Sequence, residues 1–353
     1  MNSSPLKKHA LVHAAYGFCL TFLLYCSSMA MAQEFDACAV EPTATIQKHA
    51  QIIKRKARIF PEKRFIRRKP SLNASQLSSP LSTMRLLMST GDVAVLNSLG
   101  QVKSVIKDDG SSNLIDGDRI RTGNQSFATL QTKDDSFLTL ASNTDVLLNN
   151  IKQAPIKLEL AQGSVESLVT KQKPTERKSN YQIKTPAVTL SVRGTRFKVA
   201  HLLSTGNTQV SVEDGLVAAQ LRHVCAEPAM LSVGDGAIAS AVDIRVKPML
   251  SEPTQIAISP VIKEKTLKVS VAPVPNAMLY HGQASLDESA MLVVKEVYST
   301  SPELEFQGLD NGYYFIRLSA IDDSGVEGFS DMRMVLYQPP PNSDLWLEDF
   351  LKP

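Results

Sequence analysis

The stretch "TPAVTLSVRGTRFKV" constrains the fold most, because its apolar residues change parity halfway along. Those before the Arg-Gly-Thr triplet occupy even positions and those after it occupy odd positions: Val188, Leu190 and Val192, then Phe197 and Val199. Side chains alternate across a β-strand, so a straight strand would bury one half of this set and expose the other. Glycine accepts the left-handed conformation of a β-bulge, which restores the parity. We therefore predict a bulge at Arg193, Gly194 and Thr195.

The same alternation extends over residues 88–245, which we predict to form an all-β domain. Apolar residues recur at every second position, and turn residues such as Asp214-Gly215 separate the runs. Asp-Gly between alternating segments favours a β-hairpin, because a type I′ turn needs positive φ at both central residues. No helical spacing is sustained here. An anion site at Arg193 is the alternative reading, but no helix N-terminus follows that residue to support it.

Five segments of this region occur in the order typical of one family: "GDVAVL" (91–96), "IDGDRIRTGNQSFATLQTKDDSFLTLASNT" (115–144), "LELAQGSV" (158–165), "TPAVTLSVRGTRFKV" (185–199) and "SVEDGLV" (211–217). Together they resemble the FecR domain. The resemblance implies an elongated, solenoid-like all-β module, best known from the periplasmic part of regulators that relay iron-siderophore status to a sigma factor. Those regulators also have a cytoplasmic anti-sigma segment and an internal membrane helix. We find neither in this sequence, so the exported module alone is expected.

Residues 254–338 predict a second β unit. Their pattern Leu-x-x-Gly-x-Tyr-x-x-Arg-x-x-Ala resembles a fibronectin type III-like or immunoglobulin-like β-sandwich, and its members are Leu309, Gly312, Tyr314, Arg317 and Ala320. Val271 stands where such domains often have a core tryptophan. Residues 339–353 are a Pro-rich spacer and a short tail with the only tryptophan, Trp346. We expect this tail to dock on its own domain in preference to a partner.

The first 32 residues have the form of a signal peptide. Lys7 and Lys8 precede an apolar run at 14–25, and Ala30-Met31-Ala32 has the small-x-small form of a cleavage site. The run is short for a bilayer span, so cleavage is favoured over a membrane anchor. We expect an exported protein, in the periplasm or associated with the outer membrane of a Gram-negative-type bacterium.

After cleavage the chain keeps two cysteines, Cys38 and Cys225. An oxidising compartment allows them to pair, which would tie the N-terminal arm to the first domain. Two free thiols are the alternative.

The arm itself, residues 33–87, is strongly basic and ends in a Ser-rich linker. Ile46, Ile53 and Phe60 recur at helical spacing, which predicts a short amphipathic helix. Its cationic residues would suit a membrane or lipopolysaccharide surface: Lys54, Arg55, Lys56, Arg58, Lys63, Arg64, Arg67, Arg68 and Lys69. A solvated arm is an equal alternative. Nucleic acid is not expected as a partner, because the chain is exported.

Signals of catalysis are sparse. The histidines after the leader (His49, His201, His223 and His281) lack metal-ligand spacing. Asp116 and Asp118 flank a glycine, but a turn explains them better than a calcium loop does. We expect no enzyme, no metal and no cofactor. The leading hypothesis is a binding, scaffolding or sensing module with a protein or envelope polymer as partner. A ligand-responsive component of a transmembrane signalling system is the second, and an accessory protein or enzyme of envelope polysaccharide is the third.

Overall fold

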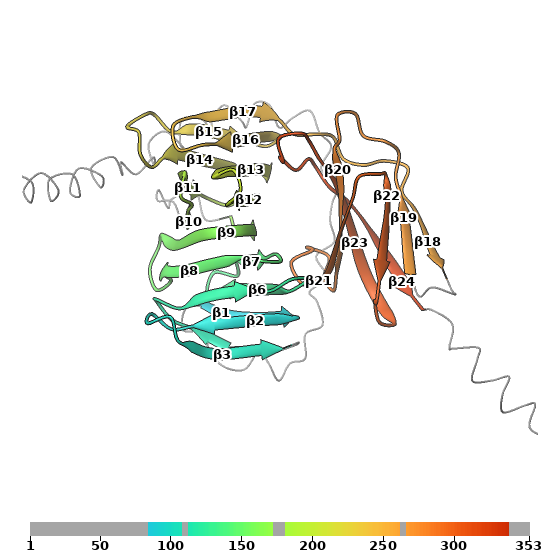
Figure 1. Cartoon of the computed structure of the whole chain (residues 1–353), viewed down its shortest axis with the longest axis horizontal. Coiled ribbons are helices and arrows are strands. Elements are labelled where there is room, and N and C mark those ends of the chain that lie inside the picture. The colour runs from blue at the N-terminus through green and yellow to red at the C-terminus, as the bar shows by residue number, and fades with distance from the viewer. Residues whose placement is uncertain (1–83, 108–111, 172–180, 262–265, 339–353) are drawn as a thin grey trace, which may run out of the picture.

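Every regular element of the described chain is a β-strand (Figure 1). The computed structural model describes residues 84–107, 112–171, 181–261 and 266–338. Strands β1 to β17 form an elongated first unit, and β18 to β24 form a second unit that stands beside it. The all-β prediction is confirmed. Within these ranges no helix has the length and hydropathy of a membrane span.

The first unit consists of two long sheets. One sheet, which we call the junction sheet, faces the second unit; its strands in order are β4 (Ser112–Leu114), β1 (Met84–Thr90), β6 (Phe127–Thr132), β7 (Phe137–Leu140), the end of β9 (Ile156–Leu168), β12 (Arg196–Leu202), β13 (Asn207–Asp214), β16 (Asp235–Ala239) and β17 (Ile244–Pro248). The order rises along the molecule from β1 to β17 (Figure 1).

The other sheet rises in the same way. Its strands in order are β3 (Val102–Lys107), β2 (Asp92–Leu96), β5 (Arg119–Thr122), β8 (Asp145–Asn150), the start of β9, β10 (Tyr181–Lys184), β11 (Val188–Val192), β14 (Leu216–Leu221) and β15 (Ala229–Ser232). Neighbours are antiparallel except the pair β9 and β10. One hydrophobic core, with residues such as Leu190 and Val199, lies between the sheets. This is the solenoid-like arrangement that the resemblance implies.

Strand β9 passes from one sheet to the other at Gly163. The φ of Gly163 is +88°, and a Cβ there would lie 2.5 Å from Cα of Thr144. Only glycine fits such a crossing, because both the backbone conformation and the space exclude a side chain.

The Arg193-Gly194-Thr195 triplet is a second crossing, which corrects the predicted bulge within one strand. Gly194 has the expected positive φ, +60°. However, β11 ends before the triplet in one sheet and β12 begins after it in the other. The parity change is resolved because the chain turns a corner and both halves then face the same core. The ladder irregularity lies one step further on, between Arg196 and Phe197.

Replacing Gly194 by valine is expected to lower the free energy of unfolding by ~1–3 kcal/mol. The added Cβ would lie 3.0 Å from Cα of Lys171, and a β-branched residue is strained at this φ. Gly206→Val is the matched control, because Gly206 has a φ of +68° with nothing within 4 Å of its Cβ position. Thermal melts of the two variants should separate the clash from the backbone strain. If Gly194→Val and Gly206→Val lower the melting temperature equally, the corner has room for the added side chain and only the backbone strain remains.

The second unit is a seven-stranded sandwich. A three-stranded sheet has the order β18 (Ala257–Val261), β19 (Thr266–Ser270) and β22 (Glu303–Gln307), and a four-stranded sheet has the order β21 (Val293–Ser299), β20 (Leu279–Ser285), β23 (Gly312–Ile321) and β24 (Asp331–Tyr337). The hydroxyl of Tyr314 donates a hydrogen bond to the carbonyl of Asp310, at 3.0 Å, as in the tyrosine corner of immunoglobulin-like sandwiches. Val271 is buried in the core. These features fit the fibronectin-like prediction.

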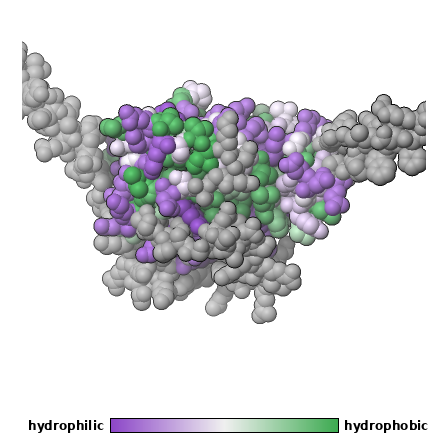
Figure 2. All heavy atoms as spheres, turned by 90° about the horizontal axis from the view of Figure 1, so that it is seen from below, coloured by the Kyte–Doolittle hydropathy of each residue, from purple (hydrophilic) through white to green (hydrophobic). Residues whose placement is uncertain are grey.

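The lower end of the first unit carries exposed apolar residues. β3 pairs only with β2 among the described strands, and Val102 and Val105 on it are exposed. Seen from below, hydrophobic residues interrupt a hydrophilic surface (Figure 2). The units meet on another side of the molecule, along the junction sheet.

Candidate functional site

Polar side chains point outward from both units at their junction, yet they are buried. On β23, Ile316 and Leu318 face the sandwich core, whereas Arg317 and Ser319 point the other way. On β12, Phe197 faces the core of the first unit and Lys198 points outward. Strand alternation would place such outward residues in water. Arg317 is only 7% exposed because the junction sheet covers it.

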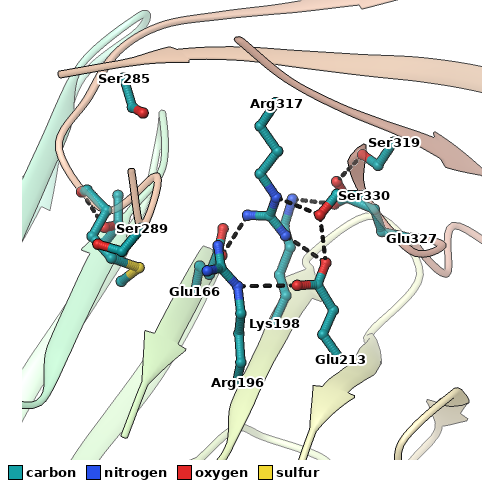
Figure 3. Close-up of polar contacts among 12 residues, drawn as sticks. Glu166, Arg196, Lys198, Glu213, Ser285, Ser289, Arg317, Ser319, Glu327 and Ser330 are labelled. Atoms are coloured by element: carbon teal, nitrogen blue, oxygen red, sulfur yellow. Dashed lines mark hydrogen bonds and ion pairs between the residues drawn. The ribbon is translucent and has the colours of Figure 1, made fainter. Parts of the chain in front are cut away.

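Eight charged or titratable residues meet here, and we call them the junction cluster: Glu166, Arg196, Lys198, Glu213, His281, Glu296, Arg317 and Glu327. Arg317 is at its centre (Figure 3). Its guanidinium donates to Glu166 and, at 2.6 Å, to Oε1 of Glu213. Nε of Arg317 donates to the hydroxyl of Ser330 at 2.8 Å. The planar guanidinium thus binds carboxylates on two strands of the first unit, β9 and β13.

Arg196 binds the same two carboxylates from β12. Its Nη2 donates to Oε1 of Glu166 at 2.7 Å, and its Nε lies 3.0 Å from Oε2 of Glu213. Two guanidinium groups therefore share two carboxylates across the junction (Figure 3). Each charge keeps a partner of opposite sign, which burial at this depth requires.

A second branch of the cluster contains the only buried histidine of the described sandwich. Nδ1 of His281 lies 2.8 Å from Oε1 of Glu327, and Nε2 lies 3.5 Å from Oε2 of Glu296. Glu327 also accepts from Lys198 of the first unit and from Ser319. The His281 ring stacks on Tyr298 with a centroid distance of 4.3 Å. His281 therefore reaches the first unit through one shared carboxylate.

Burial and charge act in opposite directions on these groups. Burial raises the pKa of Glu327, but Lys198 and His281 outweigh it and hold that pKa well below its usual value. Burial lowers the pKa of His281, yet the charge of Glu327, its hydrogen bond to Nδ1 and the nearby carboxylate of Glu296 raise that pKa overall. Burial also opposes ionisation of Glu166, whose pKa is nevertheless lowered by Arg317 and Arg196. Four carboxylates thus face three permanent cations, and a protonated His281 balances the cluster.

Below the cluster, the loop before β21 docks on the junction sheet. The carbonyl of Met291 accepts from Oγ1 of Thr129 and from Oγ1 of Thr139, both at 2.6 Å. The carboxylate of Asp287 shapes this loop by accepting from the backbone N of Leu292 at 2.6 Å. The lower contact therefore places a backbone carbonyl between two threonines of adjacent strands.

Above the cluster, an apolar contact is followed by a groove. Val326 is buried against Ile238 and Met249 of the first unit. Lys247 on β17 pairs with Asp322 at 2.6 Å. Beside this pair, where β16 and β17 point toward β20 in Figure 1, a groove of about 930 Å³ lies between the two units.

The residues singled out from the sequence lie elsewhere. Arg193, Gly194 and Thr195 form the corner described above and do not line this groove. The signal peptide, Cys38, the basic residues from Lys54 to Lys69 and the tail with Trp346 lie outside the described residues. Cys225 is disulfide-bonded. The pairing with Cys38 stays a prediction.

Asp116 and Asp118 serve as turn residues. Oδ2 of Asp118 accepts from the backbone N of Ile115 at 3.0 Å, and Oδ1 of Asp116 accepts from the backbone N of Ile151 at 2.7 Å. Over the described ranges no three acidic, histidine or cysteine side chains gather as a metal site would require. Both carboxylates therefore accept backbone N–H groups of their own turns and neighbouring loop.

No pattern in the sequence singles out the junction cluster. His281 lacks metal-ligand spacing, and Arg317 is only a member of the sandwich pattern. Outward polar residues on a strand look the same whether water or another domain covers them. The sequence contains one signal of such a site. A charged residue, Arg317, lies within an aromatic-rich strand, and another, Glu327, lies in the turn that follows it.

Comparison with known families decides the nature of the first unit. The sequence model of the family described as FecR protein matches residues 118–218. This range includes the cluster residues of β9, β12 and β13. The middle of the first unit therefore matches this family, and we call the first unit the FecR domain. A comparison with curated proteins found no match.

Solved structures resemble this chain only distantly. A candidate anti-sigma factor from Parabacteroides distasonis is 17% identical with a TM-score of 0.32, and the alignment covers 37% of this chain and 59% of that one. The FN1–FN3 domains of chicken CNTN1 are 13% identical with a TM-score of 0.22, covering 74% of this chain and 96% of that one. The structure named FN3tt is 15% identical over 25% of this chain and 97% of its own, with a TM-score of 0.22. This chain therefore spans less than two thirds of the anti-sigma factor.

Proposed function

We propose that this protein is an exported, non-enzymatic sensing module of the cell envelope of a Gram-negative-type bacterium. Its FecR domain and its sandwich act as one body that responds to a protein or envelope polymer. A separate membrane protein would then carry the signal onward. The observation that carries this proposal is the junction cluster, which couples the two units through buried charge.

The cluster favours sensing over passive scaffolding. A flexible tether between two domains needs no buried ions, and burying them is costly unless every charge is paired. Here the geometry of one unit determines whether charges of the other remain paired. A ligand that changes how the units dock would therefore change the free energy of the paired charges in both units. The buried hydroxyl of Ser319 donates to Glu327, but that carboxylate is already paired with Lys198 and His281, so binding is the activity that this geometry supports.

Two experiments test the proposal: one examines whether the protein is exported, and the other whether partner capture depends on the docking of the two units. Periplasmic protein should begin at Gln33, which N-terminal sequencing can establish. Mature protein should then capture a membrane partner from envelope extract, and an Arg317→Met variant with separated units should capture much less of it. Retention of residues 1–32 in the cytoplasm would contradict the export. Equal capture by both proteins would favour scaffolding.

A further inference from the structure

We propose that the groove between the two units binds an extended peptide segment with a bulky apolar side chain. This inference rests on the proposed function and names its binding site. The groove is built from both units: Leu202, Gln209 and Ile238 line it from the FecR domain, and Met278, Leu279 and Ile321 line it from the sandwich. Its volume of about 930 Å³ lies within the range of ligand sites, which often occur between domains.

The apolar part of the groove is accessible. Met278 is 60% exposed and Leu202 is 41% exposed, and they belong to opposite walls. Methionine adapts its shape to different apolar partners, which suits a site that accepts a side chain. Burying a leucine-sized side chain between these walls would supply the main attraction.

A buried polar atom identifies what must accompany the apolar side chain. Gln209 is 6% exposed, and within the described chain its Oε1 has no hydrogen-bond partner. Its Nε2 donates only a long bond, 3.4 Å, to the carbonyl of Ser324. A buried acceptor without a donor is costly. The Oε1 atom is itself covered, so the Gln209 side chain must turn within the groove wall for a ligand N–H to reach it and remove that cost. A peptide backbone offers an N–H next to each side chain.

Charge and shape disfavour other ligands. Two cations, Arg245 and Lys247, and two carboxylates, Asp322 and Asp323, balance one another in the lining. A strongly anionic lipid or lipopolysaccharide would therefore gain little net attraction. None of the described lining residues is aromatic, so a sugar ring would find no flat face to stack on. A neutral peptide segment needs neither a net charge nor an aromatic face in the lining.

The probes are two blocked tripeptides, acetyl-Gly-Leu-Gly-amide and acetyl-Gly-Gly-Gly-amide, with the disaccharide chitobiose as a third. Mature protein with ¹³C-methyl methionine reports binding at the methyl group of Met278. Met334, which is 67% exposed on β24, serves as an internal control outside the groove. The leucine peptide should shift the Met278 signal saturably and leave the Met334 signal unchanged. The glycine peptide should bind at least about tenfold more weakly.

Two variants test the site. Leu202→Asp should weaken the leucine peptide at least about tenfold, because it places a charge in the apolar wall. Leu336→Asp is its control, since Leu336 is 46% exposed on β24 and does not line the groove. Gln209→Leu should also weaken binding, and an apolar replacement there relieves the unpaired acceptor, so folding is expected to persist.

Three results would overturn the inference. They are the absence of a saturable Met278 shift with the leucine peptide, unchanged binding by Leu202→Asp, and tighter binding of chitobiose than of the peptide. If envelope capture by the mature protein still depends on Arg317 in that case, the sensing role stands and only the groove is refuted.

Discussion

Replacing Arg317 by methionine is expected to separate the unfolding of the two units and to destabilise their docking by ~3–5 kcal/mol. Methionine keeps much of the apolar stem of the side chain. It removes the three nitrogen atoms that donate to Glu166, Glu213 and Ser330. Glu166 and Glu213 would then share only Arg196, although both lie at a covered junction. Removing one partner of a buried ion pair costs more than the pair contributes, because the other charge remains buried. Calorimetry should show one transition for the native protein and two for the variant.

Arg333→Met is the matched control for this substitution. Arg333 lies on β24 of the same sandwich, and its half-exposed side chain pairs with Asp331. An exposed pair of this kind contributes ~0–1 kcal/mol, so the control should unfold almost as the native protein does. A double variant with Glu166→Gln should cost less than the two single changes together, because Arg317 and Glu166 contact each other. Similar losses from Arg317→Met and Arg333→Met would exclude the cluster as the source of docking.

The sequence predicted the fold well because the period of apolar residues is a local property. The alternation of apolar and polar residues in 88–245 predicted strands. The parity change at Gly194 indicated a place where one straight strand is impossible. What the pattern left open was how the chain solves that problem. A bulge and a corner between sheets both reconcile the parity of Val192 and Phe197, and only the pairing of β11 and β12 with different neighbours distinguishes them.

The junction was not predictable in the same way, because it depends on two surfaces that are far apart in the sequence. Glu166 and Arg317 are separated by 151 positions, and each is an ordinary outward polar residue on its own strand. Burial follows only when the sandwich docks on the junction sheet. The chemistry of the groove has the same origin, since its walls come from both units.

We expect His281 to make the docking of the units dependent on pH. The groups around its ring come from four places: Glu296 and Tyr298 on β21, Ser319 opposite it on β23, Glu327 in the turn after β23, and Lys198 on β12 of the FecR domain. Burial and Lys198 disfavour the imidazolium, but Glu327 and Glu296 favour it more, so its pKa is raised above the ordinary 6.5.

The sign of the pH effect follows from that direction. A histidine with a raised folded-state pKa binds its proton more tightly when folded, so its contribution is complete below the ordinary pKa of 6.5. That contribution is lost as the pH rises through the folded-state pKa. The glutamates act in the opposite range, because their lowered pKa values make their contribution disappear only in acid. Unfolding experiments should therefore show stability falling above pH 6.5, with a slope of at most ~1.4 kcal/mol per pH unit for one proton.

His281→Gln should remove this alkaline slope, because glutamine can still donate a hydrogen bond to Glu327 but carries no charge at any pH. Below pH 6 the variant should be less stable than the native protein by ~3 kcal/mol, because it lacks the positive charge that pairs with Glu327 and Glu296. His201→Gln is the control. His201 is buried beside Thr208, and burial lowers its pKa, so its titration acts on the acid side. Denaturant unfolding of the three proteins between pH 5 and pH 9 separates these effects. A slope that persists in His281→Gln and vanishes in His201→Gln would assign the pH dependence to the FecR domain instead of the junction.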